Sequence, residues 1–92
     1  MIFYSTFYKN KMESIKNILT NIDPIQLLYL DKNNIDEYLH ISNILYDIYS
    51  KKNKLYKFET FETFENVYWR GACSDELCTI ITDMINKRLN CV

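Results

Sequence analysis

The segment NIDEYLHISNILYDIYSKK, residues 34–52, is the longest clear amphipathic stretch in the interior of this 92-residue chain. Its apolar side chains recur at intervals of three and four residues, which is the spacing of one face of an α-helix. Asn33 or Asn34 is placed to cap the start of such a helix, and Lys51 and Lys52 suit the negative end of its dipole. The pattern predicts a central helix with a small bundle packed around it.

Two helices separated by a proline are predicted before this segment. From about Ser5 to Asn21 the apolar residues again step by three and four, with Ser5 as the expected cap. The residue before a proline avoids the helical region, so the helix is expected to end at Asp23. Asp23 should then cap a short helix, Pro24 to Leu30, with Pro24 at the first position, where a missing N–H costs nothing.

An aromatic and acidic tract, KFETFETFENVYWR, follows at residues 57–70. Phe58, Phe61 and Phe64 recur every three residues, and a glutamate follows each of them. A period of three matches neither a strand nor an α-helix. The tract is therefore compatible with a short, imperfect helix or with an extended or 3₁₀-like loop. We expect the short helix flanked by loops, with the glutamates facing outward.

A last helix is predicted from Ser74 to Asn90, with Ser74 as its cap and a regular apolar stripe along it. One glycine and one proline in the whole chain argue against a turn-rich β-sandwich or barrel. We therefore expect a single all-α domain over residues 1–92. Its architecture should be a compact bundle of three to four amphipathic helices plus an irregular aromatic-acidic segment.

Charge and cysteine content limit the classes of function and the cellular compartment that fit this sequence. Eleven basic and twelve acidic residues give a net charge of −1, so no basic footprint for nucleic acid is present. Three cysteines without framework spacing, and no recognisable signal peptide, favour the reducing cytoplasm. No apolar run reaches the roughly 20 residues of a membrane span. We expect a cytoplasmic protein that binds neither nucleic acid nor membrane.

The sequence contains few residue patterns that are typical of a catalytic site. His40 is the only histidine, and no sequence context joins it to Cys73 or Cys78 as a nucleophile and base. The two cysteines lack zinc-site spacing, and one glycine cannot build a phosphate loop. Three glutamates of the aromatic tract could share a cation or perform acid–base chemistry if the tract is helical, or they could form a solvated acidic edge. We favour the solvated edge and expect no enzyme activity, metal or cofactor.

Recognition of another protein fits the pattern better. Between Phe58 and Ile85 there are six acidic residues and a single base, Arg70, beside several aromatic residues. Acidic surfaces suit basic partners, and Tyr, Trp and Arg most often dominate interface energies. The residues expected to contact a partner are Glu59, Glu62, Glu65, Tyr68, Trp69, Arg70, Asp75 and Glu76.

Three short motifs also suggest a family. The segment NIDPIQL, residues 21–27, the D-E-Y of residues 36–38 and the D-E-L of residues 75–77 resemble a family of small helical bacterial proteins of unknown function. In that family a D-P-I-x-L turn precedes a D-E-Y helix, and the resemblance covers roughly residues 15–50 and 74–88. Ile22 stands where the family often has tryptophan. The chain is also similar to helical immunity proteins of contact-dependent inhibition and other polymorphic toxin systems.

The second resemblance implies an all-helical cytoplasmic domain that neutralises a cognate toxin and carries no catalytic residues. It supplies no binding residues, because immunity surfaces diverge with their toxins. The expected function is thus an immunity protein that blocks the active site of a basic toxin such as a nuclease. The alternative is a non-inhibitory interaction or structural module, either alone or as a homodimer. Metal-assisted chemistry through Glu59, Glu62 and Glu65 is the third possibility.

Overall fold

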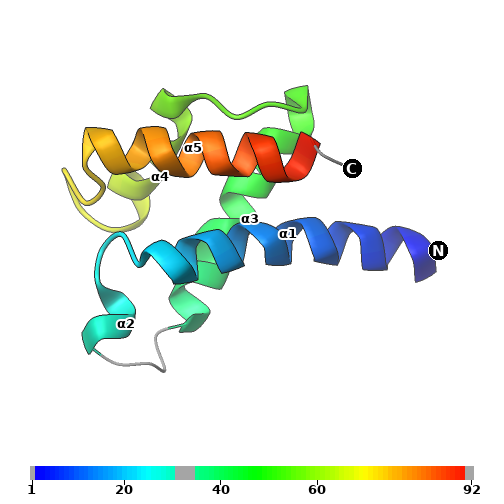
Figure 1. Cartoon of the computed structure of the whole chain (residues 1–92), viewed down its shortest axis with the longest axis horizontal. Coiled ribbons are helices and arrows are strands. Elements are labelled where there is room, and N and C mark those ends of the chain that lie inside the picture. The colour runs from blue at the N-terminus through cyan, green and yellow to red at the C-terminus, as the bar shows by residue number, and fades with distance from the viewer. Residues whose placement is uncertain (1, 31–34, 91–92) are drawn as a thin grey trace.

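The computed structural model describes residues 2–30 and 35–90. These residues form helices and no strand, which confirms the predicted all-α bundle (Figure 1). The elements are α1 (Ile2–Ile22), the single turn α2 (Leu27–Leu30), α3 (Ile35–Lys52), α4 (Lys57–Val67) and α5 (Asp75–Asn90). None of the described helices is long and apolar enough to cross a membrane.

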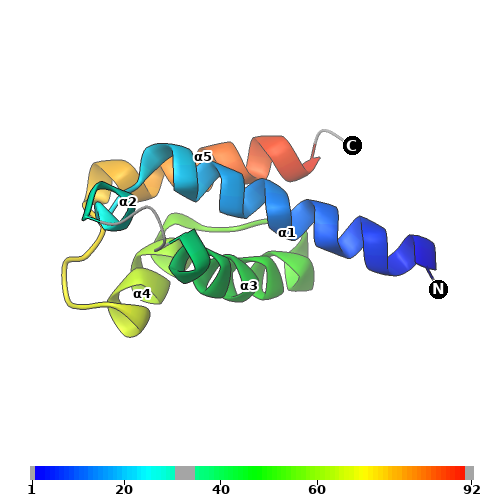
Figure 2. The ribbon, with the colours of Figure 1, turned by 90° about the horizontal axis from the view of Figure 1, so that it is seen from below.

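The four longer helices form two layers. Helices α1 and α5 lie side by side and antiparallel in one layer, and α3 and α4 form the other (Figures 1 and 2). Contacts run from α1 to α3, from α3 to α4, from α4 to α5 and from α5 back to α1, and α2 packs on α3. Every longer helix therefore buries one stripe against two neighbours, as the amphipathic spacing requires.

The core lies between the two layers, and α3 contributes most of the predicted stripe to it. Tyr38, Ile41 and Leu45 are each 0% exposed. They pack with side chains from all three other long helices, including Ile15, Leu19, Phe64, Ile81 and Ile85. The central helix is thus confirmed from Ile35 to Lys52, while its predicted caps, Asn33 and Asn34, lie outside the described residues.

The first helix starts earlier than the sequence indicated. It begins at Ile2, so Ser5 lies within the helix and cannot be its N-terminal cap. The last helix agrees with prediction: the backbone N–H of Leu77 donates to Oγ of Ser74 at 3.2 Å, and α5 ends at Asn90. Hydroxyl caps of this kind satisfy a backbone donor that the helix itself leaves free.

The prediction that Pro24 opens a helix is wrong. Asp23 and Gln26 have φ values of +50° and +60°, so each interrupts right-handed helix geometry. A turn closed by the Gln26 N–H on the Asp23 carbonyl, at 3.0 Å, holds Pro24, and α2 begins only at Leu27. Asp23 nevertheless accepts a hydrogen bond from α2, because its Oδ1 receives the Leu28 N–H at 3.1 Å.

The aromatic tract is more regular than its period suggested. Residues 57–67 are the α-helix α4, as the short-helix expectation proposed, and residues 68–74 form the irregular part. The buried residues of α4 are Thr60, Thr63 and Phe64. Thr60 fits the core because its Oγ1 lies 2.8 Å from Oγ1 of Thr82 on α5, which satisfies both buried hydroxyls.

Candidate protein-binding surface

Helix α4 carries the candidate surface, and Glu59 fixes where this helix begins. Its Oε1 accepts the backbone N–H of Tyr56 at 2.9 Å, and its Oε2 lies 3.0 Å from Nζ of Lys52. The Glu59 side chain is only 15% exposed as a result. The expectation that it faces outward is therefore wrong: Glu59 caps α4 and joins it to the end of α3.

The loop after α4 is tied down by Glu65. Oε2 of Glu65 accepts the backbone N–H of Gly71 at 2.9 Å. Gly71 has a φ of +76°, in the left-handed region that glycine adopts without steric cost. The loop that presents Trp69 and Arg70 is thus closed by one carboxylate and one glycine.

Asp75 also makes an intramolecular contact. Its Oδ1 lies 2.6 Å from Nζ of Lys57, which joins the start of α5 to the start of α4. Lys52 and Lys57 both precede Phe58, so counting charges from Phe58 leaves both cations out. The acidic excess at the surface is consequently smaller than the sequence count implies.

Three of the five predicted acidic contacts remain accessible, since Asp75 is 79% exposed despite its ion pair. Glu62 and Glu76 are exposed, and neither forms an ion pair or hydrogen bond with another described residue. Glu62 lies in the middle of α4, and Glu76 lies in the first turn of α5. Sequence alone could not separate these two from Glu59, Glu65 and Asp75, because pairing depends on which helix ends meet.

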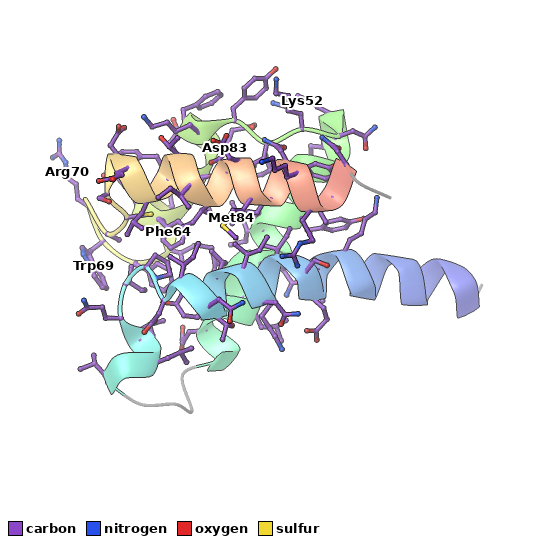
Figure 3. All side chains as sticks on the ribbon, viewed as in Figure 1. Lys52, Phe64, Trp69, Arg70, Asp83 and Met84 are labelled. Atoms are coloured by element: carbon purple, nitrogen blue, oxygen red, sulfur yellow. The ribbon has the colours of Figure 1, made fainter. Side chains whose placement is uncertain are left out.

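The predicted aromatic residues also fall into two groups, one that packs against the protein itself and one that is exposed. Tyr68 is half-buried. Its ring packs at a tilt of 40° against Phe64, with centroids 5.8 Å apart, and its hydroxyl donates to the Glu37 carbonyl at 3.3 Å. Burial, and secondarily the charge of Glu37, raises the pKa of Tyr68 to about 12. Trp69 is 53% exposed, and with Arg70 it lies at one end of the bundle, away from the core (Figure 3).

A groove between α3 and α4 completes the surface. It has a volume of about 430 Å³, and Ile44 and Ile48 line it from α3. From α4 come Phe58, Glu59, Glu62, Thr63, Asn66 and Val67. Phe58 is 59% exposed, an unusual state for so large an apolar ring. Ile44, Ile48 and Phe58 were missing from the predicted contacts because a groove exists only once two helices are placed together.

Among the residues that the structure describes, no group of three His, Cys, Asp or Glu side chains could hold a metal ion. Burial raises the pKa of the Cys73 and Cys78 thiols, which are 1% and 0% exposed, so both are poor nucleophiles. His40 lies exposed on α3, far along the chain from either thiol.

Comparison with known proteins finds no matching family model, no similar curated protein and no similar solved structure. The α3–α4 groove and the exposed aromatic residues are thus the features of this chain that bear on its function.

Proposed function

We propose that this protein is a non-enzymatic, cytoplasmic immunity protein that neutralises a cognate toxin by binding it through the α3–α4 groove and the loop after α4. The observation that carries the proposal is the exposure of Phe58 and Trp69, at 59% and 53%. Hydrogen bonds and an ion pair hold the helix and the loop on which they lie. Covering such a side chain on a partner contributes about 1.5–3 kcal/mol of hydrophobic free energy. Aromatic residues of this kind are typical anchors of interfaces.

The groove also suggests the chemistry of the partner. Its apolar lining, with Ile44, Ile48 and Val67, accommodates an apolar side chain. Glu62 is the acidic residue of the lining that has no described partner, and it lies one helical turn from Phe58. A basic toxin that offers an apolar side chain next to a lysine or arginine would match both features. Covering the catalytic groove of a basic nuclease would block its substrate.

The experiment is co-expression with the product of the adjacent gene. We expect that product to arrest growth alone and the present protein to restore growth. Phe58→Ala and Glu62→Lys should each weaken binding of the purified pair at least tenfold in titration calorimetry. Truncating a hot-spot side chain costs about 2 kcal/mol or more, and reversing the charge of Glu62 places like charges together against a basic partner. Leu30→Ala is the matched control, since Leu30 is 76% exposed on α2 and outside the groove.

The outcomes separate the possible roles. An adjacent gene product that is toxic but neither bound nor neutralised would contradict the proposal. Binding without protection would replace toxin neutralisation with a non-inhibitory adaptor role. Equal loss of binding in Leu30→Ala and Phe58→Ala would show that the groove is not the contact surface. Circular dichroism of each variant checks that its helices are intact.

A further inference from the structure

The groove between α3 and α4 is bounded by residues that are spaced four apart along each helix. Ile44 and Ile48 line it from α3. The lining residues of α4 form two rows with the same spacing: Phe58, Glu62 and Asn66, and Glu59, Thr63 and Val67. Residues four apart on a helix stand one above the other and form a ridge, and helices pack by placing such ridges into the grooves of a neighbour. The surface therefore has the geometry that accepts a third helix.

The backbone around this groove favours a helical occupant over an extended one. Most of the lining residues, such as Ile48 and Glu62, lie inside α3 or α4, where N–H and C=O groups bond along the helix. An extended segment would find no strand edge on either helix, so those of its N–H and C=O groups that face the groove would be covered without partners. A helical segment satisfies these groups within itself.

The length of the groove sets the length of its occupant. From Phe58 to Val67, α4 rises about 14 Å, because each residue of a helix adds about 1.5 Å. A segment of about two to three helical turns spans this distance. Ile44, Ile48 and Phe58 supply apolar surface along it, and Phe58 is 59% exposed. Two aliphatic side chains of the occupant, four residues apart, would cover this apolar surface.

Most charges beside the groove are already neutralised by ion pairs. These pairs join Lys51 to Asp47, Lys52 to Glu59 and Lys57 to Asp75. Lys54 is outside the lining, with its Nζ 5.1 Å from the centroid of the Tyr56 ring. His40 is exposed on α3, one turn before Ile44, and is also outside the lining. Among the described residues that line the groove, none is a cation.

Glu62 is the charged group that remains for a partner. It is exposed, stands between Phe58 and Asn66 in its row, and forms no ion pair or hydrogen bond with another described residue. Glu37 adds a second exposed carboxylate near the far end of the groove. The Tyr68 hydroxyl donates to the Glu37 carbonyl at 3.3 Å, which brings the start of α3 beside the end of α4. A lysine or arginine of the occupant would therefore face acid at this position.

We propose that the groove binds an amphipathic helix of about two to three turns from the partner. Two aliphatic side chains of this helix, four residues apart, contact Ile44, Ile48 and Phe58, and a lysine or arginine beside them pairs with Glu62. That the helix belongs to a toxin rests on the proposed function, whereas its shape and its charge rest on the groove alone.

Selection from two peptide libraries tests the shape of the occupant. The first library displays a stable helical hairpin with one randomised face. The second displays linear peptides with proline at every third position, which prevents helix formation. With the purified protein as bait, we expect binders from the helical library, with aliphatic residues four apart next to a lysine or arginine.

Variants of the protein test whether the selected helix lies in the groove. In fluorescence anisotropy, Phe58→Ala and Glu62→Lys should each weaken its binding at least tenfold. Replacing the basic residue of the selected helix by glutamate should restore affinity for Glu62→Lys and lower it for the unmodified protein. Glu76→Lys makes the same charge change at an exposed position of α5, outside the groove, and should change the affinity by less than about threefold because solvent screens distant surface charges. Circular dichroism verifies that each variant is folded.

The outcomes separate the helical occupant from the proposed function. Extended peptides that bind as tightly as the helical ones, no binders from either library, or helical binders unaffected by Phe58→Ala would overturn the helical occupant. So would a charge exchange that restores no affinity. Neutralisation of the adjacent gene product by a protein that fails this selection would leave the proposed function standing without the helix. Helical binding in the groove together with no neutralisation would do the reverse.

Discussion

The side chain of Asn86 on α5 forms two hydrogen bonds with the backbone of Leu55 in the loop between α3 and α4. The Leu55 N–H donates to Oδ1 of Asn86 at 2.8 Å, and Nδ2 of Asn86 donates to the Leu55 carbonyl at 2.8 Å. Leu55 is 1% exposed, so few waters could replace these bonds. Asn86 thereby fixes the loop that leads into α4 and to Phe58.

Replacing Asn86 should destabilise the whole fold. We expect Asn86→Ala to lower the free energy of unfolding by about 2 kcal/mol, because two hydrogen bonds are lost and two backbone groups remain unpaired. Urea unfolding followed by circular dichroism measures the change. Asn43→Ala, at an exposed position of α3, is the matched control and should change stability by less than about 0.5 kcal/mol. Equal effects at both sites would contradict the role assigned to Asn86.

The loop that carries Trp69 should depend on glycine at position 71. A Cβ at Gly71 would meet nothing within 4 Å, so the cost of Gly71→Ala arises from the φ of +76° alone. We expect a loss of about 1–2 kcal/mol, the usual penalty of the left-handed region for an L-residue. Gly71→Asn should cost less, because asparagine enters this region more readily. Urea unfolding gives both values, and equal losses for alanine and asparagine would exclude the backbone explanation.

Stability should fall in alkaline solution. Burial raises the pKa of Tyr68 from 10.0 to about 12, with Glu37 adding to the effect. Between these values the unfolded chain releases this proton and the folded chain keeps it, so the free energy of unfolding decreases as pH rises. Below about pH 10 the contribution of Tyr68 is fully present. Burial raises the pKa of Tyr38 and Tyr49 as well, so they act in the same direction.

The measurement is urea unfolding at a series of pH values from neutral to about 12. Tyr68→Phe should show a shallower decline than the unmodified protein above about pH 10, because it lacks one of the three tyrosines whose pKa is raised. Cys73 and Cys78, whose pKa values are also raised, contribute equally in both proteins. A decline above about pH 10 that is unchanged in Tyr68→Phe would contradict this assignment.

The two described thiols should react only when the protein opens. In a Cys91→Ser variant the remaining cysteines are Cys73 and Cys78, both essentially inaccessible. With a stability of about 5 kcal/mol or more, modification by an aromatic disulfide reagent should be about a thousandfold slower than in urea. Rapid labelling of either thiol in the folded protein would show that α5 and the preceding loop open locally.

Local patterns in the sequence were sufficient to predict the helices themselves. Apolar residues spaced by three and four specified α3 and α5, and Ser74 specified where α5 begins, because both signals act within a few residues of the chain. The scarcity of glycine and proline correctly predicted an all-α bundle. These features need no knowledge of what lies across the core.

The inward face of α4 could not be predicted in the same way. The three phenylalanines recur at one spacing, yet Phe64 is fully buried and Phe58 is largely exposed. Thr60, a polar residue, is fully buried as well. The reason is the partner helix: Thr82 on α5 supplies the hydroxyl that allows Thr60 to be buried. From sequence alone a polar side chain is predicted to lie on the surface unless its distant hydrogen-bond partner is known.

The turn at Asp23 also combines a feature that the sequence predicted with one that depends on the tertiary structure. The pair Asp23–Pro24 correctly marked the end of α1, since the restriction before proline is a local steric effect. Its carboxylate, however, accepts the hydroxyl of Tyr38 at 2.6 Å, fifteen residues further along. The sequence pattern placed Tyr38 in the apolar stripe of α3. Its hydroxyl reaches the turn only because α1 packs against α3.

The sequence by itself determined helix content, approximate helix ends and an acidic, aromatic character for residues 57–70. The tertiary structure decided which of those side chains a partner could meet. Glu59, Glu65 and Asp75 make contacts within the protein, whereas Glu62 and Phe58 remain at a groove that α3 and α4 form together. Helix formation depends on neighbours within one or two turns, but exposure and charge pairing depend on residues that only folding brings together.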